Sequence, residues 1–356
     1  MNSFYVSIHE LVLVFWGILV LVLLLIIVVL FYGFQQYKIL NYNLEWSAII
    51  DQKLADAIVY AEEERISDDS FGGFCQMNSF RNLFLEKLVA AKTKFSGSAQ
   101  TEIHRLFEKY DLKKDALKKL KQRKSYMIAG GIQELTAMNV TESLPQISTF
   151  LKHSSQQVYQ EAQFAMVAFK GFEGLAFLND FPHIISDWQQ LRLLRSLHQI
   201  PENCTDSVPL WLQSENTSVV IFTLRLLRKF QMLSFYQNVK TLLSHPFPLI
   251  RIQAVRTLQS LENTETRDDL TQTFDEQPTE VQREIIKTLK NSNDKKCGEF
   301  FKNQLFNHSV SGIRILSAEA LLNLGNEKDL REISQSESNS EELTRIIQHA
   351  LQEKIC

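Results

Sequence analysis

The feature that most constrains the fold is a helical pattern that recurs about every 31 residues beyond residue 124. In the best-formed copies, apolar or small residues follow an apolar anchor at four, five and eight positions, so they share one face of a helix. The Trp188 copy is the weakest, because Arg192 lies where a small residue is expected. A polar connector and a second, shorter apolar helix complete each copy. The anchors, at intervals of 31, 30, 31, 31, 31 and 32 residues, are Met127, Val158, Trp188, Val219, Ile250, Val281 and Ile313.

This period predicts the fold class. Two helices in about 31 residues are short for most helical-pair repeats and fit HEAT-like units. One helical pair cannot bury its apolar face alone, so neighbouring pairs must stack around a continuous core. With only 12 Gly and 7 Pro, the chain also lacks the turn residues of an all-β protein. We therefore predict an all-α fold, a HEAT-like α-solenoid of about six to seven helical pairs over residues 125–333.

Further helices are predicted on both sides of the repeats. Three amphipathic stretches indicate a helical capping region over residues 79–124. Residues 334–356 begin with a polar linker and end with a predicted cap helix. Residues 35–78 are expected to form a juxtamembrane helix and then a loop around Gly72 and Gly73.

The N-terminal region predicts a membrane anchor. Leu11 to Phe34 contains no charged residue, and as a helix it would be ~36 Å long, enough to cross a hydrocarbon core of ~30 Å. The preceding tail, residues 1–10, has no Lys or Arg, and no small-residue cleavage site follows. We expect a retained transmembrane helix over residues 11–34.

The charges beside this segment predict its orientation. Lys38 and Lys53 follow it, and the positive-inside rule then places the body in the cytoplasm. The four cysteines are widely spaced and form no CxxC pair, which predicts neither a disulfide framework nor a zinc site. The expected protein is single-pass, with a cytoplasmic body.

No motif in the sequence predicts catalysis or metal binding. GxSxG and HExxH are absent. Four histidines, each five residues before an anchor, could suggest a metal-binding ridge, but equivalent residues of stacked repeats lie roughly 10 Å apart and zinc ligands must each lie ~2 Å from the ion. We expect these histidines to have structural roles in the inter-repeat turns, and we predict no catalytic residue, metal or cofactor. The four are His153, His183, His245 and His308.

A basic surface is predicted on the repeats. Positions six and nine after an anchor point away from the core, and in successive repeats they hold basic residues. A solvated helix face is the favoured interpretation, and the alternative is that these residues line one side of a concave partner-binding groove. In the earlier repeats position six holds Phe164 and Leu194, so that part of the groove should be apolar. The predicted contact residues are Arg225, Arg228, Arg256, Lys287 and Lys290.

A second basic feature is the predicted amphipathic helix from Leu112 to Lys124. It could lie on anionic lipid or a partner, or it could cap the first repeat with its polar face toward water. We favour the cap, because the segment lies far along the chain from the predicted span. The candidate contact residues are Lys113, Lys114, Lys118, Lys119 and Lys121.

Three segments carry a family resemblance. Gly131–Leu135 (GIQEL), Gly171–Leu178 (GFEGLAFL) and Ser186–Leu191 (SDWQQL) resemble bacterial HEAT-repeat proteins with one N-terminal membrane helix. The resemblance implies a solenoid tethered to the bacterial inner membrane, often encoded beside a membrane glycosyltransferase of family two. It implies no catalytic residues.

Our leading hypothesis is a non-catalytic scaffold that binds a partner protein, and the resemblance makes a membrane glycosyltransferase system for surface polysaccharide the first candidate. One alternative is a HEAT-like cofactor-attachment lyase, which a pocket with convergent polar groups would support. The other is a nucleic-acid-binding HEAT-like protein, which the net charge of −3 and the absence of interleaved aromatic and basic residues disfavour. We predict neither a nucleic-acid partner nor a small-molecule substrate.

The predicted orientation can be tested with protease. If the body is cytoplasmic, protease added to intact cells leaves it uncut, and permeabilising the cells exposes it to digestion. Digestion of the body in intact cells would reverse the orientation that Lys38 and Lys53 predict.

Overall fold

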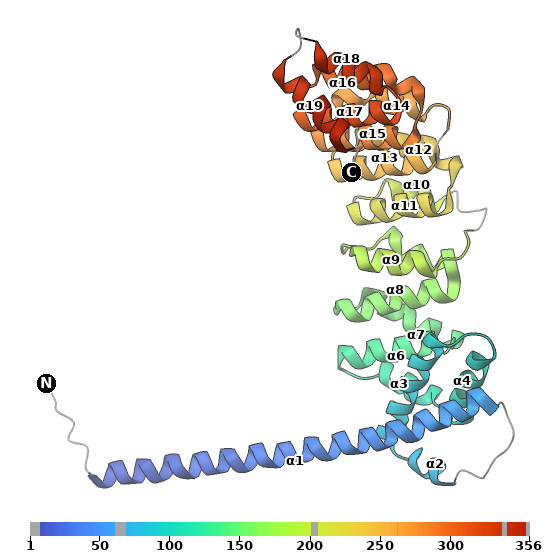
Figure 1. The fold of residues 1–356 in the computed structure, drawn as a ribbon. Helices are drawn as coiled ribbons and strands as arrows, with labels where there is room; N and C mark the ends of the chain where they lie inside the picture. The colour runs from blue at the N-terminus through green and yellow to red at the C-terminus, as the bar shows by residue number, and fades with distance from the viewer. Residues whose placement is uncertain (1–7, 61–68, 201–205, 262, 337–339, 354–356) are drawn as a thin grey trace. The chain divides into compact units, whose positions relative to one another are not determined.

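The computed structural model describes residues 8–60, 69–200, 206–261, 263–336 and 340–353 (Figure 1). Every regular element in these ranges is a helix and none is a strand, which confirms the all-α prediction. The chain divides into two compact units, Met1–Ala165 and Met166–Cys356, and each is described by itself.

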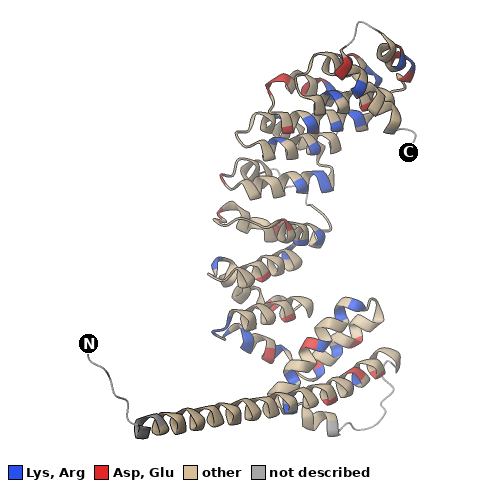
Figure 2. Ribbon diagram, turned by 60° about the vertical axis from the view of Figure 1, so that its left-hand side comes forward, with Lys and Arg blue, Asp and Glu red and all other residues tan. Residues whose placement is uncertain are grey.

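Helix α1 (Ile8–Tyr60) begins unit 1 and continues without a break for 53 residues. Its large apolar side chains between Val12 and Phe34 are all at least 41% exposed, and Figure 2 shows this part of the helix free of charged residues. In the described part of the chain, α1 is the one helix that is both long enough and apolar enough to cross a membrane. The predicted juxtamembrane helix is the same helix, and it buries Ile50 and Leu54 in the body of unit 1. Most of the predicted tail, residues 1–7, lies outside the described residues.

An aromatic cluster joins α1 to the next two helices, α2 (Asp69–Phe74) and α3 (Asn78–Lys94). Phe71 is buried, and its ring centroid lies 5.3 Å from that of Phe80 and 5.2 Å from that of Phe84. Trp46 of α1 meets Phe80 edge-on at 5.9 Å. The prediction of a loop around Gly72 was therefore wrong, because burial of Phe71 holds this segment as a short helix. Residues 61–68 lie outside the described residues.

The predicted capping helices follow as α3, α4 (Ser98–Lys109) and α5 (Lys113–Leu120). Helix α5 ends four residues before the predicted end at Lys124 and packs against α6 (Ser125–Ala137). This packing requires a glycine, because a Cβ at Gly131 would lie 2.9 Å from the carbonyl oxygen of Ala116. The rest of unit 1 comprises η1 (Thr141–Ser143), α7 (Leu144–Ser148), η2 (Thr149–Lys152) and most of α8 (Gln156–Lys170).

Unit 2 is a stack of helical pairs. The anchor-bearing helices α11, α13, α15 and α17 each pack on the next, with shorter helices between them. The elements are η3 (Gly171–Asn179), α9 (Asp187–Ser196), α10 (Ser207–Leu212), α11 (Thr217–Phe230), η4 (Leu233–Phe235), α12 (Tyr236–Thr241), η5 (Leu242–Ser244), α13 (Pro248–Ser260), α14 (Thr266–Gln272), η6 (Phe274–Glu276), α15 (Thr279–Ser292), η7 (Lys295–Cys297), α16 (Gly298–Asn307), α17 (Ser311–Asn323), α18 (Glu327–Gln335) and α19 (Glu341–Glu353).

The buried positions of unit 2 follow the predicted register. The anchors of α11, α13, α15 and α17 are fully buried, and so are the residues four, five and eight positions after each. Ala254 and Ala318, which occupy two of these positions, have no exposed surface, and small side chains there allow adjacent helices to approach closely. The helical-repeat prediction is confirmed in these four helices.

Helix α9 departs from the predicted register by one residue. Trp188 was the predicted anchor, but its side chain is 72% exposed, whereas Gln189 is buried. Counting from Gln189 places leucines at the core positions, whereas counting from Trp188 would have placed Arg192 there. The cost of burying an arginine explains the offset. The leucines are Leu193, Leu194 and Leu197.

The C-terminal helix closes unit 2. Helix α19 packs on α17 and α18 and buries Leu343, Ile346 and Ile347. Helix α18 extends to Gln335, into the segment that was predicted as a linker. Residues 337–339 of that linker lie outside the described residues.

A buried charge at Ala254 should disrupt this stack. We expect Ala254→Arg to destabilise α13 by more than ~3 kcal/mol, because the guanidinium would lie among apolar side chains without a partner. Since each repeat contacts only its neighbours, hydrogen exchange should accelerate most in α11, α13 and α15 and least in α19. Leu249→Arg is the matched control, because Leu249 lies on the same helix and is 56% exposed. Uniform acceleration across unit 2 would contradict this prediction.

Candidate partner-binding surface

The predicted basic residues of the repeats lie on three consecutive anchor helices of unit 2. Helix α11 carries Arg225 and Arg228, α13 carries Arg256, and α15 carries Lys287 and Lys290. None of the five side chains is buried. We call these five residues the cationic surface. That it lines a concave groove remains a prediction.

Three of these residues pair with acids or amides of a neighbouring repeat. Arg225 donates to Asp187 Oδ1 at 2.7 Å and to Gln190 Oε1 at 3.0 Å, both on α9. Arg256 donates two hydrogen bonds to the carboxylate of Glu284 on α15, at 2.6 and 3.1 Å. The cationic surface therefore joins repeats to one another as well as facing solvent.

The third pair joins Lys290 to Glu319 of α17 at 2.6 Å. Sequence reasoning missed these carboxylates, because it looked only for basic residues at equivalent register positions. A signal was available: Glu284 follows Arg256 by 28 residues and Glu319 follows Lys290 by 29, separations close to the repeat length.

Arg228 and Lys287 differ from the other three. Among the described residues, neither side chain makes a hydrogen bond or an ion pair. Arg228 is half-buried, and that burial, together with the charges of Arg225 and Arg256, lowers the pKa of its guanidinium, although the charge of Glu284 opposes this shift. Burial and the two neighbouring arginines outweigh Glu284, so a further acidic group beside Arg228 would favour its charged form.

The register offset in α9 adds one arginine to this surface. Counted from Gln189, position six is Arg195, which is exposed, and not Leu194, which is only 8% exposed. The prediction that Leu194 contributes an apolar part of the groove was therefore wrong. Sequence reasoning missed Arg195 because it took Trp188 as the anchor.

Three of the four inter-repeat histidines have structural roles. The Nδ1 atom of His153, His245 and His308 accepts a hydrogen bond from the backbone N–H two residues later, at 3.0 or 3.1 Å. Burial and the nearby charge of Arg251 lower the pKa of His245, which favours the neutral ring that can accept this bond. These rings shape the turn before an anchor helix. Within the described ranges, no three His, Cys, Asp or Glu side chains are arranged to hold a metal ion.

The lysines of α5 divide into two groups. Lys119 is only 13% exposed and pairs with the buried Glu134 of α6, so it was wrongly predicted as a lipid or partner contact. Burial raises the pKa of Glu134 despite this partner, because desolvation penalises the carboxylate. Lys113 pairs with Glu142 and Lys114 with Asp111. Lys118 and Lys121 are exposed.

Unit 2 also contains an open cleft of about 660 Å³ beside α10. Exposed Ile184 and Leu210 line it. Its amides serve the fold: Asn216 donates to the carbonyl oxygens of Phe181 and His183, and Asn179 accepts from the indole of Trp211. Asn179 and Asn216, two of the polar residues that line the cleft, therefore already have partners within the fold.

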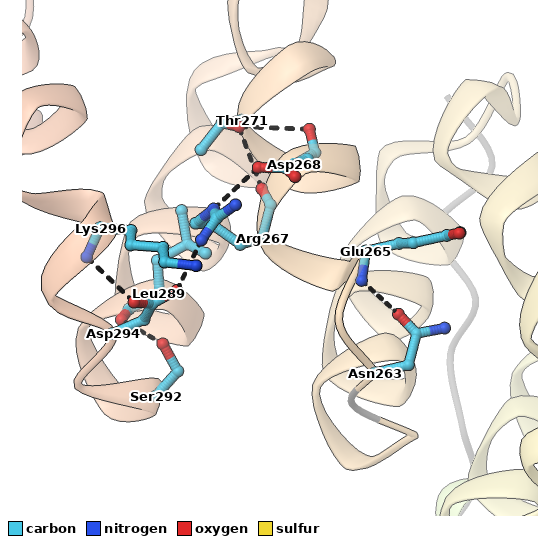
Figure 3. Close-up of polar contacts among 9 residues, drawn as sticks. All are labelled: Asn263, Glu265, Arg267, Asp268, Thr271, Leu289, Ser292, Asp294 and Lys296. Carbon is cyan, nitrogen blue, oxygen red and sulfur yellow. Dashed lines mark hydrogen bonds and ion pairs between the residues drawn. The ribbon is translucent and has the colours of Figure 1, made fainter.

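A smaller cavity of about 220 Å³ lies between the ends of α13 and α15. Figure 3 shows Arg267 at this place, between Asp268 and Asp294, with hydrogen bonds of 2.7 and 3.0 Å. The two carboxylates raise the pKa of Arg267 above its ordinary value, Asp268 contributing more. Arg267 and Asp294 thus already have partners within the fold, and exposed Lys296 is the remaining charged residue of the cavity lining.

Comparisons with known proteins add little to this geometry. No family model matches the chain, and no curated protein matches it. An engineered protein solved by the Northeast Structural Genomics Consortium is 14% identical with a TM-score of 0.35, covering 78% of this chain and 87% of its own.

Two further solved structures are similar at 12% identity. The CpcE–CpcF complex of phycocyanin lyase from Nostoc sp. PCC7120 has a TM-score of 0.25 and covers 76% of this chain and 94% of its own. A designed armadillo repeat protein has a TM-score of 0.24 and covers 67% of this chain and 98% of its own. Similarities at this level assign no function to the chain.

The Arg256–Glu284 pair should couple two repeats measurably. In a double-mutant cycle with alanine at both positions, we expect a coupling of about 0.5–1 kcal/mol, because the pair is bidentate and Glu284 is mostly buried. The opening free energies of α13 and α15 amides, from hydrogen exchange, supply the values. High salt should reduce the coupling, since the Debye length falls to ~3 Å at 1 M.

The matched control for this cycle is the exposed Arg345–Glu341 pair within α19, for which a coupling of about 0.3–0.5 kcal/mol is expected. A coupling at Arg256–Glu284 no larger than at this control would show that the pair does not hold the repeats together.

Proposed function

We propose that this protein is a non-catalytic scaffold that α1 anchors in a membrane and that binds an acidic segment of a partner protein on its cationic surface. The observation that carries the proposal is Arg228, a half-buried guanidinium near two other arginines that makes no hydrogen bond or ion pair among the described residues and shares the charge of Glu284 with Arg256. A folded protein gains little from such a charge on its own, so a ligand is its simplest use.

The geometry of the cationic surface supports an extended acidic partner. Arg228 and Lys287 lie two anchor helices apart, on α11 and α15, with the Arg256–Glu284 pair between them. A carboxylate that reaches Arg228 would also lie near Arg225 and Arg256, whose present partners come from the chain itself. The partner would thus compete with Asp187 and Glu284 as well as neutralise Arg228.

The proposed anchoring rests on α1, whose exposed apolar length suits a single membrane crossing. The bacterial inner membrane and a cytoplasmic body belong to the same proposal. A membrane glycosyltransferase system for surface polysaccharide remains the candidate partner that the family resemblance suggests.

The proposal predicts that two charges control partner binding. In Arg228→Gln/Lys287→Gln, affinity for a synthetic acidic peptide, and for the protein that co-purifies with wild type in mild detergent, should fall at least tenfold. Charge-assisted hydrogen bonds contribute roughly 1.5–3 kcal/mol each, and 1.4 kcal/mol is tenfold in affinity. Calorimetry with the full-length protein in detergent measures the peptide, and quantitative co-purification measures the partner.

The control variant removes the same charge elsewhere in unit 2. Lys295→Gln/Lys328→Gln changes two exposed lysines outside the cationic surface and should leave binding unchanged. If both variants bind the partner as tightly as wild type, the cationic surface is not the binding site. An equal loss of affinity in both variants would show that binding depends on the net charge of the protein and not on these two positions.

A further inference from the structure

Helix α1 sets the height of unit 1 above the membrane, provided that α1 spans it as proposed above. The helix is unbroken between Phe34, the end of the apolar stretch, and Trp46, which contacts Phe80 in the body. Twelve residues of helix span ~18 Å, and lipid headgroups fill the first ~5–8 Å beyond the hydrocarbon. The part of unit 1 around Trp46 and Phe80, which we call its near end, therefore lies close to the headgroup layer.

The turn between α4 and α5 is held at this near end. Arg81 follows Phe80 in α3 and donates hydrogen bonds to the carbonyl oxygens of Tyr110 at 2.9 Å and Asp111 at 3.0 Å. It also pairs with Asp115 in the first turn of α5 at 2.5 Å. The basic segment is thus far from the membrane helix in sequence but near it in the fold. A long separation in sequence was the reason to favour a purely capping role for Leu112–Lys124, and the fold removes that reason.

The charge of this region is strongly positive. Residues 109–124 contain eight basic residues against two acidic ones, Asp111 and Asp115. Asp115 is already neutralised by Arg81, and Asp111 pairs with Lys114, which is still 79% exposed. We call the following exposed residues the lysine surface: Lys109, Lys114, Lys118, Lys121 and Arg123.

Most of this charge has no counterion in the protein. Among the described residues, Lys109, Lys118, Lys121 and Arg123 make no ion pair. Lys114, Lys118 and Lys121 follow one another at four and three positions, so they share one face of α5, opposite buried Ala116 and Leu120. Lys119, on the buried side, is excluded.

We propose that the lysine surface binds anionic lipid headgroups and so holds the first helices of unit 1 against the membrane. The partner chemistry is a layer of phosphate-bearing headgroups, which needs charge density and proximity but no shaped pocket. Basic residues near an anionic bilayer act additively within a Debye length of ~8 Å. Trp46, whose partner Phe80 precedes Arg81, would lie ~10–13 Å beyond the headgroups, so long lysine side chains beside this turn can approach them. Acidic protein or nucleic acid would need no such placement beside α1.

Trypsin gives a direct readout, because Lys121 and Arg123 are exposed cleavage sites within the surface. The full-length protein is reconstituted into vesicles of phosphatidylcholine alone or with phosphatidylglycerol, and cleavage after these two residues is followed by mass spectrometry. We expect cleavage about tenfold slower on the anionic vesicles, and the difference should vanish at high salt.

The test variant leaves both cleavage sites intact. Lys109→Gln/Lys114→Gln/Lys118→Gln should be cleaved at nearly the same rate on both vesicles. Lys295→Gln/Lys296→Gln/Lys328→Gln removes the same charge from unit 2 and should keep the wild-type protection.

Flotation separates failure of this inference from failure of the proposed anchor. If α1 does not insert, the wild-type protein fails to float with neutral vesicles, and the anchor itself is wrong. If it floats with both vesicles but is cleaved equally fast on them, the lysine surface does not bind lipid. Protection by heparin but not by anionic vesicles would assign the surface to a polyanionic macromolecule instead.

Discussion

The structure of unit 2 depends on one constraint, the burial of a shared apolar face between successive anchor helices. In α11, α13, α15 and α17 the buried positions recur at the anchor and at four, five and eight residues beyond it. No helix in such an array can be stable by itself, because its apolar side is covered only by its neighbours. The polar faces are then free to vary, and they carry the charges that distinguish one repeat from the next.

The basic residues of the cationic surface fall into two groups, those that pair with an adjacent repeat and those that do not. Arg225, Arg256 and Lys290 are engaged by acidic or amide groups of adjacent repeats, so part of the cationic surface contributes to the stack. Among the described residues, Arg228 and Lys287 make no such contact, and our proposed function depends on these two residues. Partial exposure limits what each inter-repeat pair can contribute to stability. The same exposure lets a partner compete for the arginines.

The structure of unit 1 depends on a different feature, the continuity of α1 from the apolar stretch into the core. One helix provides both the exposed apolar stretch and the residues Ile50 and Leu54 that lie in the core of the unit. If α1 crosses a membrane as proposed, an unbroken helix would fix the distance of unit 1 from the bilayer, which a flexible linker would not. The α4–α5 turn is tied to the same part of the unit through Arg81.

The sequence by itself determined the helical class, the repeat period, the apolar stretch of α1 and most core positions, since these follow from local periodicity. It failed at Trp188, where the rule of an apolar anchor favoured the tryptophan over Gln189, although counting from Trp188 placed Arg192 at a core position. It also failed at Phe71, whose burial depends on rings contributed by α3. Only the tertiary structure decided which charges are free, because the partners of Arg225, Arg256 and Lys119 come from other helices. Ion pairs between repeats depend on side-chain reach across the stack, which the spacing along one chain does not specify.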